Sequence, residues 1–304
     1  MDHHCQAVNN IASTVRKFYE SGESYRVFHG SSNSSRPRHG PNENVVDISM
    51  LSNIDIDTER RIALVEPNVP MDRLVEATLV YGLIPLVVMD YPSITAGGGF
   101  SAMSGESSSF RYGFFNDTVN LVEIVLGSGD VVRASRQERE DLFHGAAGAA
   151  GTLGIVTLME LCLVEARKFI KTTYRRAEDI SHAVSEVQAQ TKNLDNDYID
   201  GIVFSPEHGV VITGQLTDTK PAECGLQTFS HASDPWFYLH VQDKTQNLSP
   251  SSTLVEYIPL REYLFRYDRA AFWVGRQGYS YFKLIPFTKF FRWLLDDYSH
   301  TRTL

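Results

Sequence analysis

The chain lacks the features of a disulfide-rich or membrane-spanning protein. Its three cysteines, Cys5, Cys162 and Cys224, are odd in number and far apart. They suggest no disulfide framework, so we expect a reducing compartment. No run of about 18 apolar residues occurs, which predicts no transmembrane helix. The N-terminus MDHHCQAVNN has no basic region followed by an apolar core, so we expect no signal peptide.

An excess of basic residues is also lacking. The sequence has 28 Lys and Arg against 37 Asp and Glu, a net charge of -9. Nucleic-acid binding needs a basic face, so we expect no nucleic-acid partner. His3, His4 and Cys5 cluster at the terminus, but we interpret this tract as incidental and assign no metal site. With 304 residues and 42% hydrophobic content, the chain is long enough for a sizeable core and two domains.

Glycine and serine are abundant between Pro92 and Phe115, where the sequence reads PSITAGGGFSAMSGESSSFRYGFF. Glycine lets a backbone approach a ligand closely, and small hydroxyls and bare amides can hold an anion. The apolar run Leu83–Val88 precedes this stretch. A hairpin pattern with a Gly-Ser-Gly-Asp turn, Leu121–Val132, follows it. We therefore predict a ligand-binding loop held between buried strands.

A dinucleotide fingerprint is an alternative interpretation of the same stretch. Gly97, Gly99 and Ala102 satisfy G-x-G-x-x-G/A. That motif requires a strand running into the first glycine, an amphipathic helix after it and an acidic residue about 20 positions on. Pro92 and Ser93 interrupt the approach, and serines follow where the helix should be. We therefore reject a Rossmann NAD site.

The rest of the sequence predicts a mixture of helices and strands. Apolar residues at helical spacing indicate a helix that includes Ile11 and ends near Gly22, and a second helix from Pro70 to Gly82. Basic and polar residues from Lys168 to Arg176 lead into a polar helical stretch, and 217–252 is expected to be loop-like. An aromatic-rich tail follows, most of it interpreted as ordinary core. The predicted strands are 45–48, 61–66, 154–164, 198–204 and 209–216.

Several motifs, in order, resemble one known family. Thr95-Ala-Gly-Gly-Gly, Ser104-Gly-Glu-Ser-Ser-Ser and Arg111-Tyr-Gly look like the flavin loop of the vanillyl-alcohol-oxidase or PCMH-type FAD proteins. Within these, the chain is most similar to the Δ24-sterol reductase (Diminuto-like) group. The resemblance covers roughly Ile11 to Trp293. Further matching segments are Arg61-Ile-Ala-Leu-Val-Glu-Pro67, Asp141-Leu-Phe143, Gly151-Thr-Leu-Gly-Ile155 and Glu256-Tyr-Ile-Pro-Leu-Arg261.

The resemblance implies an α+β fold in which a two-subdomain PCMH-type FAD-binding module, residues 1–166, precedes a partial substrate (cap) domain, residues 167–304. It also implies FAD as cofactor. Many members attach a histidine after the pyrophosphate turn to the flavin, but serines and Asn33 follow Gly30 here, so we expect non-covalent FAD; a covalent link would point to His29 or His39. The expected cofactor-binding residues are Gly30, Ser31, Ser32, Asn33, Ser34, Thr95, Ala96, Gly97, Gly98, Gly99, Phe100, Ser101, Ala102, Met103, Ser104, Gly105, Glu106, Ser107, Gly151, Gly154 and Ile155.

The activity implied by the resemblance is reduction of a C=C bond in a sterol or related terpenoid, with NADPH as donor. Tyr257 or Tyr263 would donate the proton, while Arg261 and Arg266 would hold an anion or a backbone turn; structural roles for these residues stay open. The chain departs from the sterol reductases, which carry histidines in the segment matched by 262–268 and an acidic residue where this chain has Val274. Another substrate therefore stays open.

Two alternatives remain beside the reductase. One is a flavin oxidase or dehydrogenase that acts on a small alcohol or secondary metabolite, and the other is a truncated, non-catalytic flavin-binding remnant. The family continues past Trp293, so we expect an incomplete cap that exposes the aromatic stretch 279–295. Basic residues are interleaved there, which favours docking on a membrane surface or a partner. We expect a cytoplasmic protein, with peripheral contact to the ER membrane left open.

Overall fold

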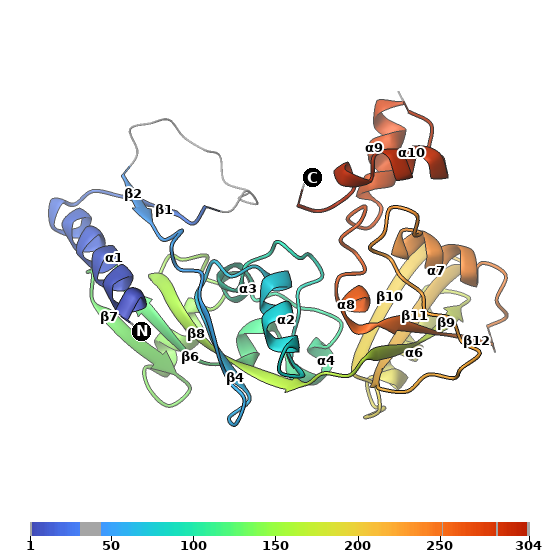
Figure 1. Ribbon diagram of the computed structural model, residues 1–304, viewed down its shortest axis with the longest axis horizontal. Coiled ribbons are helices and arrows are strands. Elements are labelled where there is room, and N and C mark those ends of the chain that lie inside the picture. Colours follow the sequence, from blue (N-terminus) through green and yellow to red (C-terminus); the bar gives the residue numbers. More distant parts are fainter. Residues whose placement is uncertain (1, 31–43, 251, 284, 303–304) are drawn as a thin grey trace. The chain divides into compact units, whose positions relative to one another are not determined.

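A computed structural model describes residues 2–30, 44–250, 252–283 and 285–302 (Figure 1). The chain forms two compact units. Unit 1 comprises Met1–Val88, Ser93–Gly105 and Gly113–Glu165, and unit 2 comprises Met89–Pro92, Glu106–Tyr112 and Ala166–Leu304. Both mix helices with β-sheet, which confirms the predicted α+β class. The flavin and substrate roles assigned to residues 1–166 and 167–304 remain predictions.

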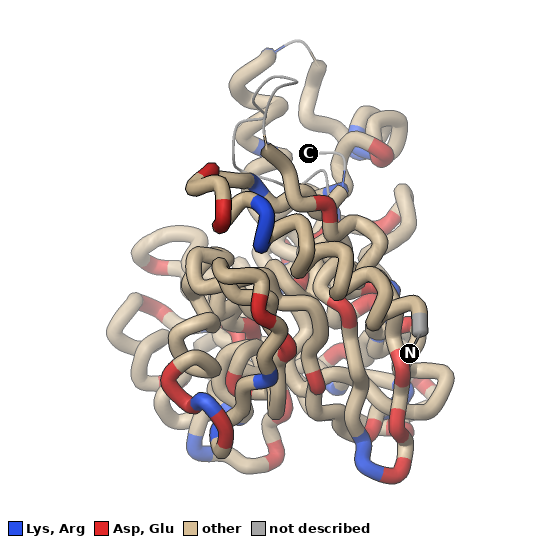
Figure 2. Tube along the Cα trace, turned by 90° about the vertical axis from the view of Figure 1, so that its left-hand side faces the viewer, with Lys and Arg blue, Asp and Glu red and all other residues tan. Residues whose placement is uncertain are grey.

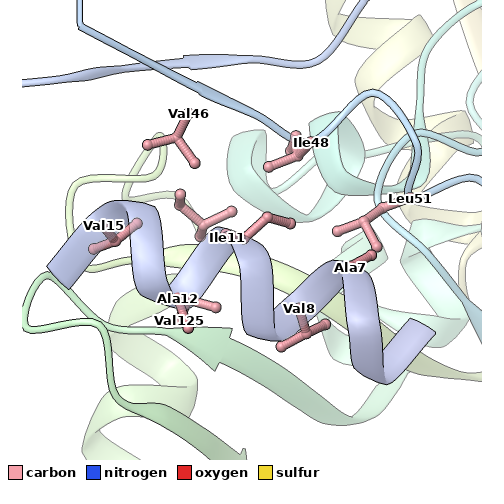
Figure 3. Close-up of a cluster of buried hydrophobic side chains, with 10 residues drawn as sticks. Ala7, Val8, Ile11, Ala12, Val15, Val46, Ile48, Leu51 and Val125 are labelled. Atoms are coloured by element: carbon pink, nitrogen blue, oxygen red, sulfur yellow. The ribbon is translucent and has the colours of Figure 1, made fainter. Parts of the chain in front are cut away.

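Helix α1 (Asp2–Ser21) packs one apolar face on the sheets of unit 1 (Figure 3). Every third or fourth residue of this face is buried, as an amphipathic helix requires. The helix ends at Ser21, next to the predicted end near Gly22, and the φ of 67° at Gly22 suits glycine. Glu23 N–H donates to Phe18 O across this end. The buried cluster contains Ala7, Val8, Ile11, Ala12, Val15, Val46, Ile48, Leu51, Val125 and Ile155.

The main sheet of unit 1 is antiparallel, with strand order β3-β4-β8-β6-β7 and β5 paired with β8. A separate parallel pair joins β1 to β2. The predicted β6–β7 hairpin is confirmed, and Gly129 N–H donates to Leu126 O in its turn. Helix α2 (Met71–Leu79) follows Pro70. The strands are β1 (Arg26–Phe28), β2 (Val45–Asp47), β3 (Ile54–Asp57), β4 (Ile62–Val65), β5 (Leu83–Pro85), β6 (Val119–Val125), β7 (Val131–Ser135) and β8 (Ile155–Glu165).

The glycine-serine stretch is not a loop throughout, which corrects the sequence-based expectation. Residues Ala96–Ala102 form helix α3, and Ser109–Tyr112 form the single turn α4, which belongs to unit 2. The hydroxyl of Thr95 caps α3 by accepting a hydrogen bond from Gly98 N–H. This cap and tertiary contacts overcome the poor helix propensity of three glycines. The 3₁₀ turn η1 (Phe115–Thr118) and helix α5 (Glu140–Ala146) complete unit 1.

Unit 2 is built on an antiparallel sheet of order β10-β11-β9-β12. One strand here was not predicted from the sequence, and one expectation was wrong. Strand β9 (Phe169–Ala177) occupies the basic segment, because alternate residues such as Ile170 and Tyr174 are buried. Helix α7 (Phe237–Thr245) lies in the stretch expected to be loop. The remaining elements are β10 (Tyr198–Ser205), β11 (His208–Thr217), β12 (Thr253–Pro259), α6 (Ile180–Gln190) and α8 (Leu260–Leu264).

The C-terminal part of unit 2 exposes apolar side chains. It contains α9 (Val274–Phe282), α10 (Lys289–Leu294) and η2 (Asp296–Tyr298). Tyr281 is 81% exposed and Phe290 is 60% exposed. Among the described residues, no helix is long and apolar enough to cross a bilayer. Acidic and basic positions are interspersed along the described trace (Figure 2).

Candidate cofactor cradle and buried ionic cluster

The first turn of α3 packs directly on the chain that follows β4. Gly97 N–H donates to Pro67 O at 2.9 Å, and Ala96 N–H donates to Val69 O at 2.9 Å. A Cβ added at Gly97 would lie 2.7 Å from Pro67 Cβ and 2.9 Å from Pro67 O. Gly97 is therefore required by the fold at this close approach.

All three amides of this first turn already donate within the chain. Ala96 and Gly97 donate to backbone carbonyls, as described above, and Gly98 N–H donates to the Thr95 hydroxyl. The sequence-based expectation that these amides grip an anion thus has no support from their geometry. What this region presents to a ligand is an exposed backbone without Cβ at Gly98 and Gly105, and the half-buried hydroxyls of Ser101 and Ser104.

A second glycine-rich turn lies against α3. Gly148 N–H donates to Phe100 O at 3.3 Å, and a Cβ at Gly148 would lie 2.7 Å from Met103 Sδ. Its φ of 71° also favours glycine. Gly154 ends the turn, where a Cβ would lie 2.7 Å from Val125 O. The turn 147–154, which contains Gly151, is therefore a close-packed element, as predicted.

Gly30 connects to the same region through a short series of contacts. It has a φ of 74°, and an added Cβ would lie 3.2 Å from Ser49 Cβ. The preceding Ile48 accepts a hydrogen bond at its carbonyl from the Asn68 side chain, and Asn68 follows Pro67, which anchors α3. Gly30, α3 and the turn 147–154 thus belong to one connected part of unit 1. Ser31, Ser32, Asn33, Ser34 and His39 lie outside the described residues.

The chemistry of these segments fits FAD. A large cofactor with a flat ring and a pyrophosphate needs backbone that it can approach closely, together with neutral hydrogen-bonding groups. The exposed backbone of Gly98 and Gly105 and the hydroxyls of Ser101 and Ser104, in α3 and directly after it, supply both. Individual contacts with the cofactor remain predictions.

Unit 2 contains a buried ionic cluster around Arg266, whose side chain is 1% exposed. The guanidinium donates from Nη1 to Asp90 Oδ1 at 3.2 Å and from Nη2 to Asp200 Oδ2 at 3.1 Å. Nη1 also donates to Tyr263 O at 2.8 Å, and the Tyr263 ring centroid lies 4.2 Å from Cζ. The charge is therefore paired and stacked, as burial requires.

Glu106, from the glycine-serine stretch, joins this cluster. Asp90 N–H donates to Glu106 Oε1 at 3.2 Å. Burial raises the pKa of Glu106 to about 9, and the neighbouring Asp90 carboxylate raises it further. Burial also raises the pKa of Asp90, to about 6, although Arg266 opposes the shift. A buried carboxyl that stays protonated near neutral pH is a candidate acid.

The expected catalytic residues are distributed differently. Tyr263 and Arg266 lie in contact, whereas Tyr257 lies in β12 beside Leu226 and Arg261 is exposed on α8. Burial raises the pKa of the Tyr263 phenol, which makes it a poorer proton donor. Each proposed catalytic role stays a prediction.

Sequence reasoning missed Asp90 and Asp200. Asp90 follows the apolar run 83–88, and Asp200 interrupts the apolar strand YIDGIVF. A charged residue beside or within an apolar strand is the one local signal that could have drawn attention to them. Their common partner, Arg266, could not be inferred from the sequence, because these residues are far apart in the chain.

Part of this chain matches a family model, and known proteins match most of its length. Residues 4–135 match the family of the FAD binding domain. The Δ(24)-sterol reductase of Pisum sativum is 32% identical over 265 residues, 82% of this chain and 46% of the relative. The Homo sapiens Δ(24)-sterol reductase is 27% identical over 281 residues, 89% of this chain and 52% of the relative. Cytokinin dehydrogenase 9 of Oryza sativa subsp. japonica is 28% identical over 217 residues, 68% of this chain and 42% of the relative. The chain thus spans about half the length of these relatives.

Proposed function

Since the chain belongs to the PCMH-type FAD-binding family, we propose that it is an FAD-dependent oxidoreductase that reduces a C=C bond of a sterol or related terpenoid with NADPH. The single observation that carries the FAD assignment is the connected cradle of unit 1. There α3 and the Gly30 segment, which lie within the matched residues 4–135, come together with the turn 147–154, which follows those residues in the chain. The substrate class rests on the names of the sterol reductase relatives.

The residues of the chain have separate tasks in this reaction. Reduced FAD, when bound, supplies the hydride. The exposed backbone of Gly98 and the hydroxyls of Ser101 and Ser104 would hold the cofactor by close approach and hydrogen bonds. An acid must deliver a proton to the second alkene carbon. Arg266 is better suited to fixing buried carboxyl groups than to contacting substrate, because its charge is already paired with Asp90 and Asp200.

The test is a half-reaction experiment on FAD-loaded protein. Under anaerobic conditions, NADPH should bleach the flavin absorbance, and a sterol with an isolated Δ24 double bond should restore it, with the reduced sterol detected by mass spectrometry. Failure of the sterol to reoxidise the flavin would contradict the reductase assignment.

A flavin oxidase or dehydrogenase is the second candidate, favoured by the cytokinin dehydrogenase relative and by the lost histidines in 262–268. It predicts fast reoxidation of the reduced flavin by air, whereas the reductase predicts slow reoxidation. A chain that binds FAD but reacts with neither NADPH nor any tested substrate would support the third possibility, a non-catalytic remnant.

We further propose that the protein is cytoplasmic and contacts the ER membrane peripherally through the stretch 279–295. Tyr281, Phe282, Phe290 and Trp293 are exposed there, and Lys283 and Lys289 are interleaved. Apolar rings beside basic groups favour an anionic lipid surface. Leu284 lies outside the described residues.

The membrane contact is tested by sedimentation with anionic liposomes. Replacing both Phe290 and Trp293 by serine should abolish binding, whereas Tyr19→Ser, which removes an aromatic ring that is 65% exposed on α1, should leave it unchanged. Equal binding by all three proteins would refute the contact.

A further inference from the structure

Two arginines in the C-terminal part of unit 2 lie on one aromatic ring without a carboxylate partner. Arg276, on α9, and Arg292, on α10, place their Cζ atoms 5.8 Å and 4.8 Å from the ring centroid of Phe287. Among the residues that the structure describes, neither guanidinium forms an ion pair or a hydrogen bond. By contrast, the buried Arg269 is paired with Asp296 at 2.7 Å. Two positive charges on one ring repel each other unless an opposite charge compensates them.

Aromatic side chains between α9 and α10 hold this arrangement together. The ring of Phe287 lies 5.3 Å from that of Tyr279 and 5.6 Å from that of Trp236, centroid to centroid. The Tyr279 hydroxyl donates to Phe291 O at 3.2 Å and so joins α9 to α10, which lie side by side in Figure 1. Ring contacts rather than ion pairs therefore place the two guanidiniums.

The surroundings of Arg292 do not compensate its charge. The pKa of this half-buried guanidinium is lowered, first because burial penalises the charged form and further because Arg269 lies nearby. The Tyr238 and Tyr279 phenols oppose the shift, and Asp243 opposes it least. An anion held beside Arg292 would favour the charged form and remove this penalty.

Two buried donors beside these arginines also lack a partner among the described residues. Trp236 is 1% exposed and Tyr238 is 5% exposed, yet neither the indole N–H nor the phenol forms a hydrogen bond there. Arg292 Cζ lies over the Trp236 ring, 5.6 Å from its centroid. Burial raises the pKa of the Tyr238 phenol to about 12, although the charges of Arg276 and Arg292 oppose the shift. Buried donors normally have an acceptor, because an unpaired one costs free energy.

These side chains thus combine donors with positive charge, and they require an anionic acceptor. Guanidinium and indole groups have no acceptor atom, and a tyrosine hydroxyl can donate as well. Water could satisfy the two buried donors but would leave both guanidiniums uncompensated. A carboxylate carries one charge, whereas a phosphate monoester carries about −1.5 to −2 charges at pH 7 and offers three acceptor oxygens. Arginine binds phosphate through pairs of parallel hydrogen bonds, so a monoester matches two arginines.

We propose that Arg276 and Arg292 bind a phosphate monoester, with the Trp236 indole N–H and the Tyr238 hydroxyl as further donors. All four residues belong to unit 2, so the site requires no contribution from unit 1. The inference is independent of the reduction proposed above. It also goes beyond the proposed membrane contact, because it names the chemical group that is bound. That group can belong to a soluble molecule or to a lipid headgroup such as that of phosphatidic acid.

NMR spectroscopy of the purified chain tests the site through the Trp236 indole. The chain has three tryptophans, and the indole N–H signal of Trp236 is the one that Trp236→Phe lacks. Glycerol 3-phosphate, a soluble phosphate monoester, should shift this signal with a dissociation constant of about 1 mM or below. Glycerol with sodium chloride at the same ionic strength should not shift it.

Two results of this titration would overturn the proposal. If none of the three indole signals shifts, water alone serves the buried donors, and no variant is needed to reach that conclusion. A shift confined to the other two tryptophans would place the phosphate away from Trp236.

Replacement of each arginine tests its share in the binding. Arg276→Gln and Arg292→Gln should each weaken the binding of glycerol 3-phosphate by about tenfold or more, since charge-assisted hydrogen bonds are lost with each. Lys289→Gln is the matched control, because it also removes one positive charge from α10, and the exposed Lys289 takes part in none of the contacts described above. Equal weakening by all three variants would indicate attraction by overall charge alone and would overturn the site.

Liposomes distinguish a lipid headgroup from a soluble monoester. Phosphatidic acid presents a phosphate monoester and phosphatidylserine a diester, and the two kinds of vesicle are matched in surface charge. A headgroup site predicts that Arg276→Gln combined with Arg292→Gln weakens binding to phosphatidic acid by about tenfold or more and leaves binding to phosphatidylserine unchanged. Equal binding of the wild type to both vesicles, together with a Trp236 shift by glycerol 3-phosphate, assigns the site to a soluble monoester. If the chain binds no vesicle, the proposed membrane contact fails, while the titration still decides the phosphate site.

Discussion

The two neighbouring glycines of α3 make separable predictions, because one is packed against the chain and the other is exposed. Gly97→Ala places a methyl 2.7 Å from Pro67 Cβ, whereas carbon atoms normally approach to about 3.5–4.0 Å. Either Pro67 or the helix must move by about 1 Å. Such overpacking costs about 1–3 kcal/mol, of which helix propensity returns up to about 1 kcal/mol.

Gly98→Ala differs in both respects. Gly98 is exposed, and its added Cβ would meet only the Thr95 hydroxyl at 3.2 Å and Ile94 Cγ2 at 3.9 Å. The propensity gain of up to about 1 kcal/mol offsets this tight contact, so stability should change little. The methyl would, however, occupy the surface along which we propose that FAD approaches. Affinity for FAD should therefore fall about tenfold or more, or about 1.4 kcal/mol.

The assay pairs thermal unfolding of the FAD-free protein with titration by FAD. Gly97→Ala should lower the melting temperature by a few degrees, since each 1 kcal/mol shifts it by about 2–4 °C in a domain of this size. Gly127→Ala is the control, because a Cβ there would meet nothing within 4 Å. Wild-type FAD affinity in Gly98→Ala would refute the placement of the cofactor on α3.

Two further predictions concern pH. A carboxyl whose pKa is raised in the folded state destabilises that state as the pH rises from its unfolded to its folded pKa. Between about pH 5 and 9, the wild type should therefore lose stability relative to Glu106→Gln, with a limiting slope of about 1.4 kcal/mol per pH unit. A difference in unfolding free energy between the two proteins, measured with urea, that stays constant across this range would contradict the prediction. His300 Nδ1 lies 2.6 Å from Asp268 Oδ2, and this bond raises the pKa of His300 and lowers that of Asp268. Its contribution is present below the unfolded pKa of His300 and is lost as the pH rises through the folded one, so His300→Gln should cost roughly 1 kcal/mol at pH 6 and less at pH 9. A loss that is the same at both pH values would count against the ion pair.

The elements that the sequence predicted well are those whose determinants are local. The Gly-Ser-Gly-Asp turn defines the β6–β7 hairpin, and Gly22 ends α1. Their signals lie within a few residues of the element itself. The order of the family motifs predicted the α+β fold with an FAD-binding module, and the match to the FAD binding domain confirms this prediction.

The features that could not be predicted, helix α3 and the cluster around Arg266, depend on residues that are distant in the sequence. Three consecutive glycines disfavour a helix, yet α3 forms because Val69 and Pro67 accept its first amides. The sequence around Arg266 does not distinguish it from the other arginines of this segment. Its role emerges only when Asp90 and Asp200 are brought to its two terminal nitrogens. Tertiary contacts therefore decided both the cradle and the cluster.

The central claim is that unit 1 holds FAD without a covalent bond, and the most direct measurement is an absorbance spectrum of the purified protein before and after acid precipitation. The account predicts flavin bands that pass into the supernatant. Colour that remains in the pellet would reveal a covalent link and contradict non-covalent binding. A folded protein that is colourless and takes up no added FAD would contradict the cofactor site itself.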